Sequence, residues 1–295
     1  MDLKPALSYE EQVDRLIDYH KLGVRDKGSA IEILKVVNYY RLSGYGVGLK
    51  QKDNPECFIG GTTLEHIFAL YCFDSQLKNN LIHTIEQIEI ALRTQIAHRL
   101  AMVYGADALY DKDNYLDTLN KDGKSIYGII NQNLEKEIKH QHNVPFVRHH
   151  EKNYEGKFPV WVSVELMSFG TLSSLYSILK PEDKKSIASL YRTTPNYLKN
   201  WILCLVEVRN ICAHYIRLYN MPLKQTPRLY REHRRYRAKQ NKLFPILLII
   251  KRMLNSNQQW DSLLADIRRT IKKHEGSFRF SYMGFPNDWE SILGE

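Results

Sequence analysis

The chain has 295 residues and a formal net charge of +9 at pH 7, and 43% of its residues are hydrophobic. This is the composition of an ordinary globular protein, and it excludes a disordered or collagen-like chain. Residues 1–200 carry 25 basic and 25 acidic side chains, whereas residues 201–295 carry 17 basic and 8 acidic ones, so the whole excess lies there. A basic C-terminal third indicates a polyanionic partner, and nucleic acid is the first candidate.

The sequence carries no sign of export or of membrane insertion. Its first residues lack the apolar segment of a signal peptide. The longest compact apolar run, residues 244–250, is too short to span a bilayer. The cysteines at positions 57, 72, 204 and 212 show neither a C-x-x-C pair nor a zinc-like spacing. We therefore expect a cytoplasmic protein with reduced thiols and no membrane partner.

Apolar residues recur at three- and four-residue steps through most of the chain, which is the period of an amphipathic helix. The clearest case is residues 63–102, where neither Pro nor Gly interrupts the pattern. Only residues 57–59 look extended, so the sequence predicts an all-α protein. We expect helices, in chain order, over residues 10–22, 29–38, 63–102, 124–142, 160–179, 182–191, 196–216, 237–254 and 259–273.

Polar stretches separate some of these helices. Residues 50–62 form a polar connector that contains two glycines, and residues 105–123 and 140–156 are polar enough to be long loops. We expect one compact helical domain over residues 61–295, preceded by a small helical subdomain over residues 1–60.

Arginine and histidine together can cleave RNA without a metal. A histidine titrates near neutral pH and can move the proton of the 2′-OH or of the leaving oxygen. A guanidinium can hold the phosphate and stabilise the charge that develops on it. The spacing Arg-x4-His occurs five times, which is more often than composition alone would produce. Since all five pairs share it, the spacing cannot choose among them: Arg15/His20, Arg93/His98, Arg209/His214, Arg228/His233 and Arg269/His274.

Sequence context favours Arg209 and His214. Together with Asn210 they stand late in an otherwise apolar helix pattern, where burying them without partners would be costly. They therefore either pair with one another or line a cleft. In an ideal helix Arg209 and His214 lie about 140° apart. They can meet one phosphate only if the helix ends or bends between them, or if a second copy of the chain completes the site. A hydrogen-bonded cluster at a helix end is the alternative.

Three blocks of the sequence resemble a known family. Residues 38–45 read NYYRLSGY, residues 161–175 read WVSVELMSFGTLSSL and residues 209–220 read RNICAHYIRLYN. In this order they resemble the signatures of the Abi-like proteins of bacterial abortive-infection systems, the AbiD/AbiF group. The third block is the most specific, and it also resembles the RNxxAH form of the R-x4-6-H motif of HEPN ribonucleases.

The resemblance implies a HEPN-like helical bundle and an RNA-cleaving toxin that is held in check until phage infection. It implies cleavage without a metal or cofactor, by sites that act as a pair across a homodimer or between two domains. Arg209 would hold the phosphate, His214 would act as acid and base, and Asn210 would orient the histidine or the phosphate. Some relatives are encoded beside a small noncoding RNA, which implies RNA as a regulator as well as a substrate.

Arg93 and His98 are a second HEPN-like box on the long helix. Thr94 stands where the stronger motif has Asn210. Glu89, four residues before Arg93, offers an ordinary ion pair instead. Two boxes in one chain would permit an intramolecular composite site, and structural packing of Arg93 is the alternative.

Two segments are candidates for contact with RNA. Residues 224–242 carry eight Lys or Arg against one Glu, with tyrosines interleaved, and they follow the candidate helix directly. Near the N-terminus, aromatic residues next to a cation suit stacking on unpaired bases, with helix-end packing as the alternative. The RNA-binding candidates are Arg228, Arg231, Arg234, Arg235, Arg237, Lys239, Tyr230 and Tyr236 in the first segment, and Tyr40 and Arg41 in the second.

Two other functions stay open at the level of the sequence. The chain could be a non-catalytic RNA-binding HEPN protein in which Arg209 and His214 are structural. It could also be a helical interaction partner of another toxin. Cleavage of RNA in EDTA, compared with Arg209→Ala and His214→Ala variants, separates the three.

Overall fold

The computed structural model describes residues 5–239, 241–254 and 256–294, apart from the side chains of residues 234 and 237–239. These residues form thirteen α-helices, and no β-strand occurs among them. Their strand-like pairings are isolated backbone bridges, one of which joins Lys50 to Phe58 in the region predicted to be extended. The all-α prediction is therefore confirmed.

The helices follow the predicted order, with additional short ones. In chain order they are α1 (Tyr9–Asp18), α2 (Lys27–Val36), α3 (Tyr39–Ser43), α4 (Leu64–Tyr104), α5 (Ile126–His140), α6 (Pro145–Asn153), α7 (Val160–Leu166), α8 (Phe169–Ile178), α9 (Pro181–Leu190), α10 (Pro195–Ala213), α11 (Leu243–Met253), α12 (Asn257–Lys273) and α13 (Trp289–Gly294).

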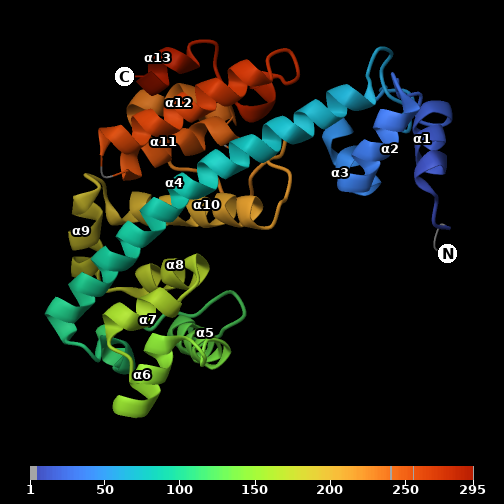
Figure 1. The fold of residues 1–295 in the computed structure, drawn as a ribbon. Coiled ribbons are helices and arrows are strands. Elements are labelled where there is room, and N and C mark those ends of the chain that lie inside the picture. The colour runs from blue at the N-terminus through green and yellow to red at the C-terminus, as the bar shows by residue number, and fades with distance from the viewer. Residues whose placement is uncertain (1–4, 240, 255, 295) are drawn as a thin grey trace.

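The fold is organised around α4, whose 41 residues make a rod about 60 Å long. Its start is capped by Thr63, whose hydroxyl accepts the N–H of His66 at 3.2 Å. The small helices α1–α3 lie at its N-terminal end, α10–α12 lie along its middle and α5–α8 lie at its C-terminal end (Figure 1). The buried residues of all three groups belong to one continuous hydrophobic core. The division of the chain at residue 60 stays a prediction.

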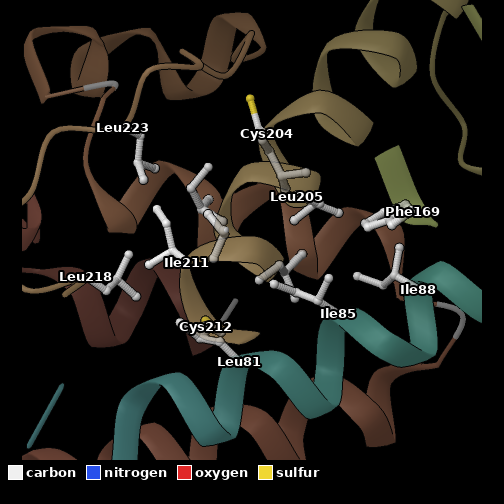
Figure 2. Packing of buried hydrophobic residues seen from close by; sticks show 14 of the residues in the cluster. Leu81, Ile85, Ile88, Phe169, Cys204, Leu205, Ile211, Cys212, Leu218 and Leu223 are labelled. Carbon is white, nitrogen blue, oxygen red and sulfur yellow. The ribbon is translucent and has the colours of Figure 1, made fainter. Parts of the chain in front are cut away.

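The contact between α4 and α10 positions the candidate site. In Figure 2, Leu81 and Ile85 of α4 face Leu205 and Cys212 of α10. All four side chains are buried, so apolar burial fixes α10 against the rod. The C-terminal end of α10, which carries the candidate motif, is thereby held beside the N-terminal half of α4.

The longest apolar run of the sequence is part of this core. Residues 244–250 lie in α11, and every one of them is buried. Among the described residues, no helix combines the length and the apolar character that crossing a bilayer requires.

Several predicted elements differ from the structure. The helix expected over residues 237–254 begins only at Leu243 as α11, because residues 231–239 form a separate 3-10 helix. The helix expected over residues 160–179 is divided into α7 and α8, because Ser168 leaves the helical conformation and its hydroxyl caps α8 by accepting the N–H of Thr171 at 3.1 Å. The loop expected over residues 140–156 contains α6, which begins with Pro145 at a position where the missing N–H has no helical partner to lose.

Candidate functional site

The candidate motif lies where α10 ends. The last helical residue is Ala213, and His214 is the C-cap residue. The predicted helix over residues 196–216 therefore stops between Arg209 and the end of the motif. Arg209 is partly exposed, and Asn210 and His214 are exposed, although most of the preceding residues of α10 are buried or partly buried. The polar residues of the motif are thus accessible at one end of a helix that is otherwise packed.

Arg209 is held by a buried carboxylate from α4. Its Nε lies 3.7 Å from Oε2 of Glu89, whose side chain is 8% exposed, and its Nη1 donates to Oδ1 of Asn210 at 3.5 Å. Glu89 also pairs with Arg93, and Arg93 donates to the backbone carbonyl of Val164. One carboxylate therefore restrains both arginines and connects the motif to the block at residues 161–175.

The second predicted box does not form an equivalent site. Arg93 is 8% exposed, and its guanidinium is engaged by Glu89 and Val164. His98 is exposed on a different face of α4. A phosphate could reach Arg93 only by breaking a buried ion pair, which is energetically expensive. The structure thus favours the packing alternative for Arg93, and we do not propose a second cleavage site there.

The loop that follows His214 is anchored by Asp74, which is completely buried in α4. The Asp74 carboxylate accepts the hydroxyl of Tyr45 at 2.7 Å and the backbone N–H groups of Leu218 at 3.1 Å and Tyr219 at 2.7 Å. It also pairs with Lys78 at 3.0 Å. Burial, together with the Asp74 charge, raises the pKa of Tyr45 well above its ordinary value, so this hydroxyl stays a donor.

Side chains of the N-terminal block hold the same loop from the other side. The guanidinium of Arg41 donates to the carbonyl of Tyr215, and Arg217 donates to the carbonyl of Gly44. The blocks at residues 38–45 and 209–220, far apart in the sequence, are therefore in direct contact. Arg41 was predicted to bind RNA. In the structure its guanidinium makes a hydrogen bond to the backbone next to His214, and this bond helps to position the candidate motif.

The basic segment runs back along α10, away from His214. The Glu207 carboxylate accepts the N–H groups of Lys224 and Gln225, each at 2.7 Å. Further on, the Trp201 indole donates to the carbonyl of Arg228 at 2.9 Å. Trp201 precedes His214 by thirteen residues, or about 20 Å along a helix axis. Only the start of the segment adjoins the motif, and the rest extends toward the other end of α10.

The two tyrosines of the basic segment pack against other aromatic rings of the protein. Tyr230 stacks on Tyr197 with ring centroids 4.6 Å apart, and its hydroxyl donates to Thr193. Tyr236 is 8% exposed and packs edge-on against Phe244. Tyr236 is buried and Tyr230 is half-buried, and both rings already have aromatic partners. The expectation that they contact RNA stays a prediction.

Some of the side chains predicted to contact RNA are exposed at the surface, namely three arginines of the basic segment and Tyr40 near the N-terminus. Arg228, Arg231 and Arg235 are exposed, and Arg235 pairs loosely with Asp288 at 3.9 Å. Tyr40 is 85% exposed. The side chains of Arg234, Arg237 and Lys239 lie outside the described residues.

The motif also contains a cysteine, but its thiol is unsuited to nucleophilic chemistry. Cys212 is buried, and burial raises the pKa of its thiol to about 12. Since the thiolate is the nucleophilic form, this group is inert at neutral pH. No group of three or more His, Cys, Asp or Glu arranged to hold a metal ion occurs in the described part of the chain. Arg209, Asn210 and His214 are the accessible polar groups of the motif.

Comparison with known proteins gives one family. The family described as Abi-like protein matches residues 32–220, which is more than half of the chain. All three sequence blocks lie in this range, and the match ends with the last residue of the third block. No curated protein and no solved structure matches the chain. Because the family matches more than half of the chain, the chain belongs to the Abi-like protein family.

Proposed function

We propose that this Abi-like protein is a metal-independent HEPN endoribonuclease, an RNA-cleaving toxin of a cytoplasmic phage-defence system. The observation that supports this most is the end of α10, where Arg209, Asn210 and His214 are accessible while the apolar residues between and before them, Val208, Ile211 and Cys212, are buried in the core. Accessible polar side chains on a helix that is otherwise buried are typical of a site that binds a charged ligand.

The proposed reaction needs three groups. The imidazole of His214 removes the proton of a 2′-OH, and the 2′-oxygen attacks the adjacent phosphorus. The bond from phosphorus to the 5′-oxygen breaks, and that oxygen leaves with a proton from an imidazolium. Arg209 holds the phosphate and stabilises its charge. The Asn210 amide orients the phosphate or the histidine. The products are a 2′,3′-cyclic phosphate and a free 5′-OH.

Two chains are proposed to complete the site. Arg209 is held against α4 by Glu89, and no hydrogen bond joins Arg209 to His214 among the described residues. Residues five positions apart lie about 140° apart around a helix, and His214 is the residue at which the helix stops. A homodimer would bring the arginine of one copy toward the histidine of the other. A noncoding RNA is proposed as a regulatory partner beside the substrate RNA.

One observation favours a second candidate function. Because Arg209 already has a buried carboxylate partner in Glu89, its role can be structural. The protein would then bind RNA through exposed cations without cutting it.

Purified protein incubated with RNA in EDTA tests the proposal. Wild-type protein is expected to cut, and Arg209→Ala and His214→Ala are expected to lose cleavage. His98→Ala serves as the matched control, since His98 is also an exposed histidine that follows an arginine at the same spacing. Binding of RNA without cleavage by wild type would favour the non-catalytic function. Equal cleavage by all four proteins would refute the site.

A further inference from the structure

The end of α10 is closed by a residue in the left-handed conformation that is not glycine. The N–H of Tyr215 donates to the carbonyl of Cys212 at 3.2 Å, and the N–H of Ile216 donates to the carbonyl of Ile211 at 3.0 Å. These two bonds define a Schellman motif, in which the residue after the C-cap takes the left-handed conformation. That residue is usually glycine, because a side chain is strained there. Here it is Tyr215, with φ +56°.

The strained tyrosine gains little from packing. Its side chain is 70% exposed, and no hydrogen bond or ring contact of that side chain occurs among the described residues. Its backbone, in contrast, is held by the Schellman bonds and by Arg41, which donates to its carbonyl. Arg192 takes the same left-handed position after α9. What distinguishes Tyr215 is an exposed aromatic ring on a fixed backbone next to the candidate site, and this combination indicates a function for the side chain.

The surroundings of Tyr215 suit a polyanion. The two blocks that meet here, residues 38–45 and residues 209–220, carry three Arg in total and no Asp or Glu. The nearby carboxylates of Asp74 and Glu89 are buried and already engaged by cations. Tyr40, the neighbour of Arg41 in the sequence, presents a second ring that is 85% exposed.

We propose that Tyr215, assisted by Tyr40, is a base-stacking platform that restricts this site to single-stranded RNA. The proposal rests on RNA being the ligand of the site, as proposed above. A base inside a duplex is already stacked on its neighbours, whereas an unpaired base can lie on an exposed aromatic ring. With Tyr215 adjacent to His214, the stacked base would belong to a nucleotide beside the scissile phosphate.

The ring can be removed without straining the fold. Tyr215→Gly deletes the side chain and places the preferred residue at the left-handed position, so the variant should be at least as resistant to thermal unfolding as the parent. Tyr215→Phe keeps the ring and is the matched control. All variants are made in the full chain with His214→Ala, so that binding is measured while the RNA stays intact.

Fluorescence anisotropy then compares an unstructured RNA oligonucleotide with the same strand annealed to its complement. Tyr215→Gly should weaken single-strand binding about 5- to 150-fold, the range for loss of one stacked base. Duplex binding should change little, and Tyr215→Phe should bind like the parent.

Four results would overturn the proposal: unchanged single-strand binding by Tyr215→Gly, equal weakening for both RNAs, no binding of either RNA by the parent, or a change of oligomeric state by light scattering with RNA binding unaltered. Because the readout is binding, it is separate from the ribonuclease proposal. If wild type cuts no RNA while Tyr215→Gly loses single-strand affinity, the stacking proposal stands and the nuclease assignment fails.

Discussion

Substitution of Asp74 by asparagine should be among the most destabilising single changes in this protein. Asp74 is completely buried, and its carboxylate holds the N–H groups of Leu218 and Tyr219 and the ammonium of Lys78. Asp74→Asn leaves the ammonium of Lys78, which is 5% exposed, without a carboxylate, so that the Ile216 carbonyl at 3.1 Å is its remaining partner and its charge is not balanced. Removing one partner of a buried pair costs about 3–5 kcal/mol. For 295 residues the entropy of unfolding is about 0.6 kcal/mol/K, so this corresponds to a fall in Tm of about 5–8 °C.

Circular dichroism during heating and urea unfolding measures this effect. Asp14→Asn is the matched control, because Asp14 pairs with Lys27 at the shorter distance of 2.7 Å, but with side chains that are 51% and 65% exposed. An exposed pair contributes about 0–1 kcal/mol, so Asp14→Asn should unfold almost like wild type. If Asp74→Asn loses no more stability than Asp14→Asn, burial does not determine the strength of these ion pairs. Asp74 would then not hold the loop at residues 218–219 in the way that we infer.

Three further outcomes follow from the structure. Burial raises the pKa of the Cys204 and Cys212 thiols to about 12, so at pH 8 only about one in 10⁴ is a thiolate. Both should react with a thiol reagent only after unfolding, and rapid labelling in the native protein would contradict their burial. Ser168→Ala removes the cap of α8 and should cost about 1 kcal/mol in urea unfolding; a change near zero would mean that the cap does not maintain the break between α7 and α8. Arg93→Met should cost about 3 kcal/mol by leaving its buried carboxylate partner short of a cation, whereas His98→Ala should change stability by less than about 0.5 kcal/mol. Equal effects of these last two would argue against a structural role for Arg93.

Helical periodicity predicted the large elements well. The apolar pattern of residues 63–102 became α4, Leu64–Tyr104, because a long uninterrupted pattern has a single way to bury its apolar face. The end of α10 was predicted three residues too late. In a sequence, a glycine just after the last helical residue is the usual sign that a helix ends. Here Tyr215 takes the left-handed position that glycine normally occupies. The sequence therefore lacked the usual signal.

The candidate motif could be found in the sequence, but its supports could not. Asp74 and Lys78 stand four residues apart on α4, which predicts a pair between them. Their bonds to the loop at residues 216–219 depend on tertiary packing that spacing does not encode. The basic segment shows the same limit. Its composition indicated a polyanion, whereas its course along α10 and the burial of Tyr236 depend on contacts with Trp201 and Phe244.

The proposed chemistry is tested most directly by the ends of the cleaved RNA. A labelled oligonucleotide is incubated with the full-length protein in EDTA, beside the same strand carrying a single 2′-deoxynucleotide at the cleaved position. Attack by the 2′-oxygen predicts a 2′,3′-cyclic phosphate and a 5′-OH from the first strand and no cut at that position in the second. A 5′-phosphate end, or equal cleavage of the deoxy-substituted strand, would contradict the roles that we propose for Arg209 and His214.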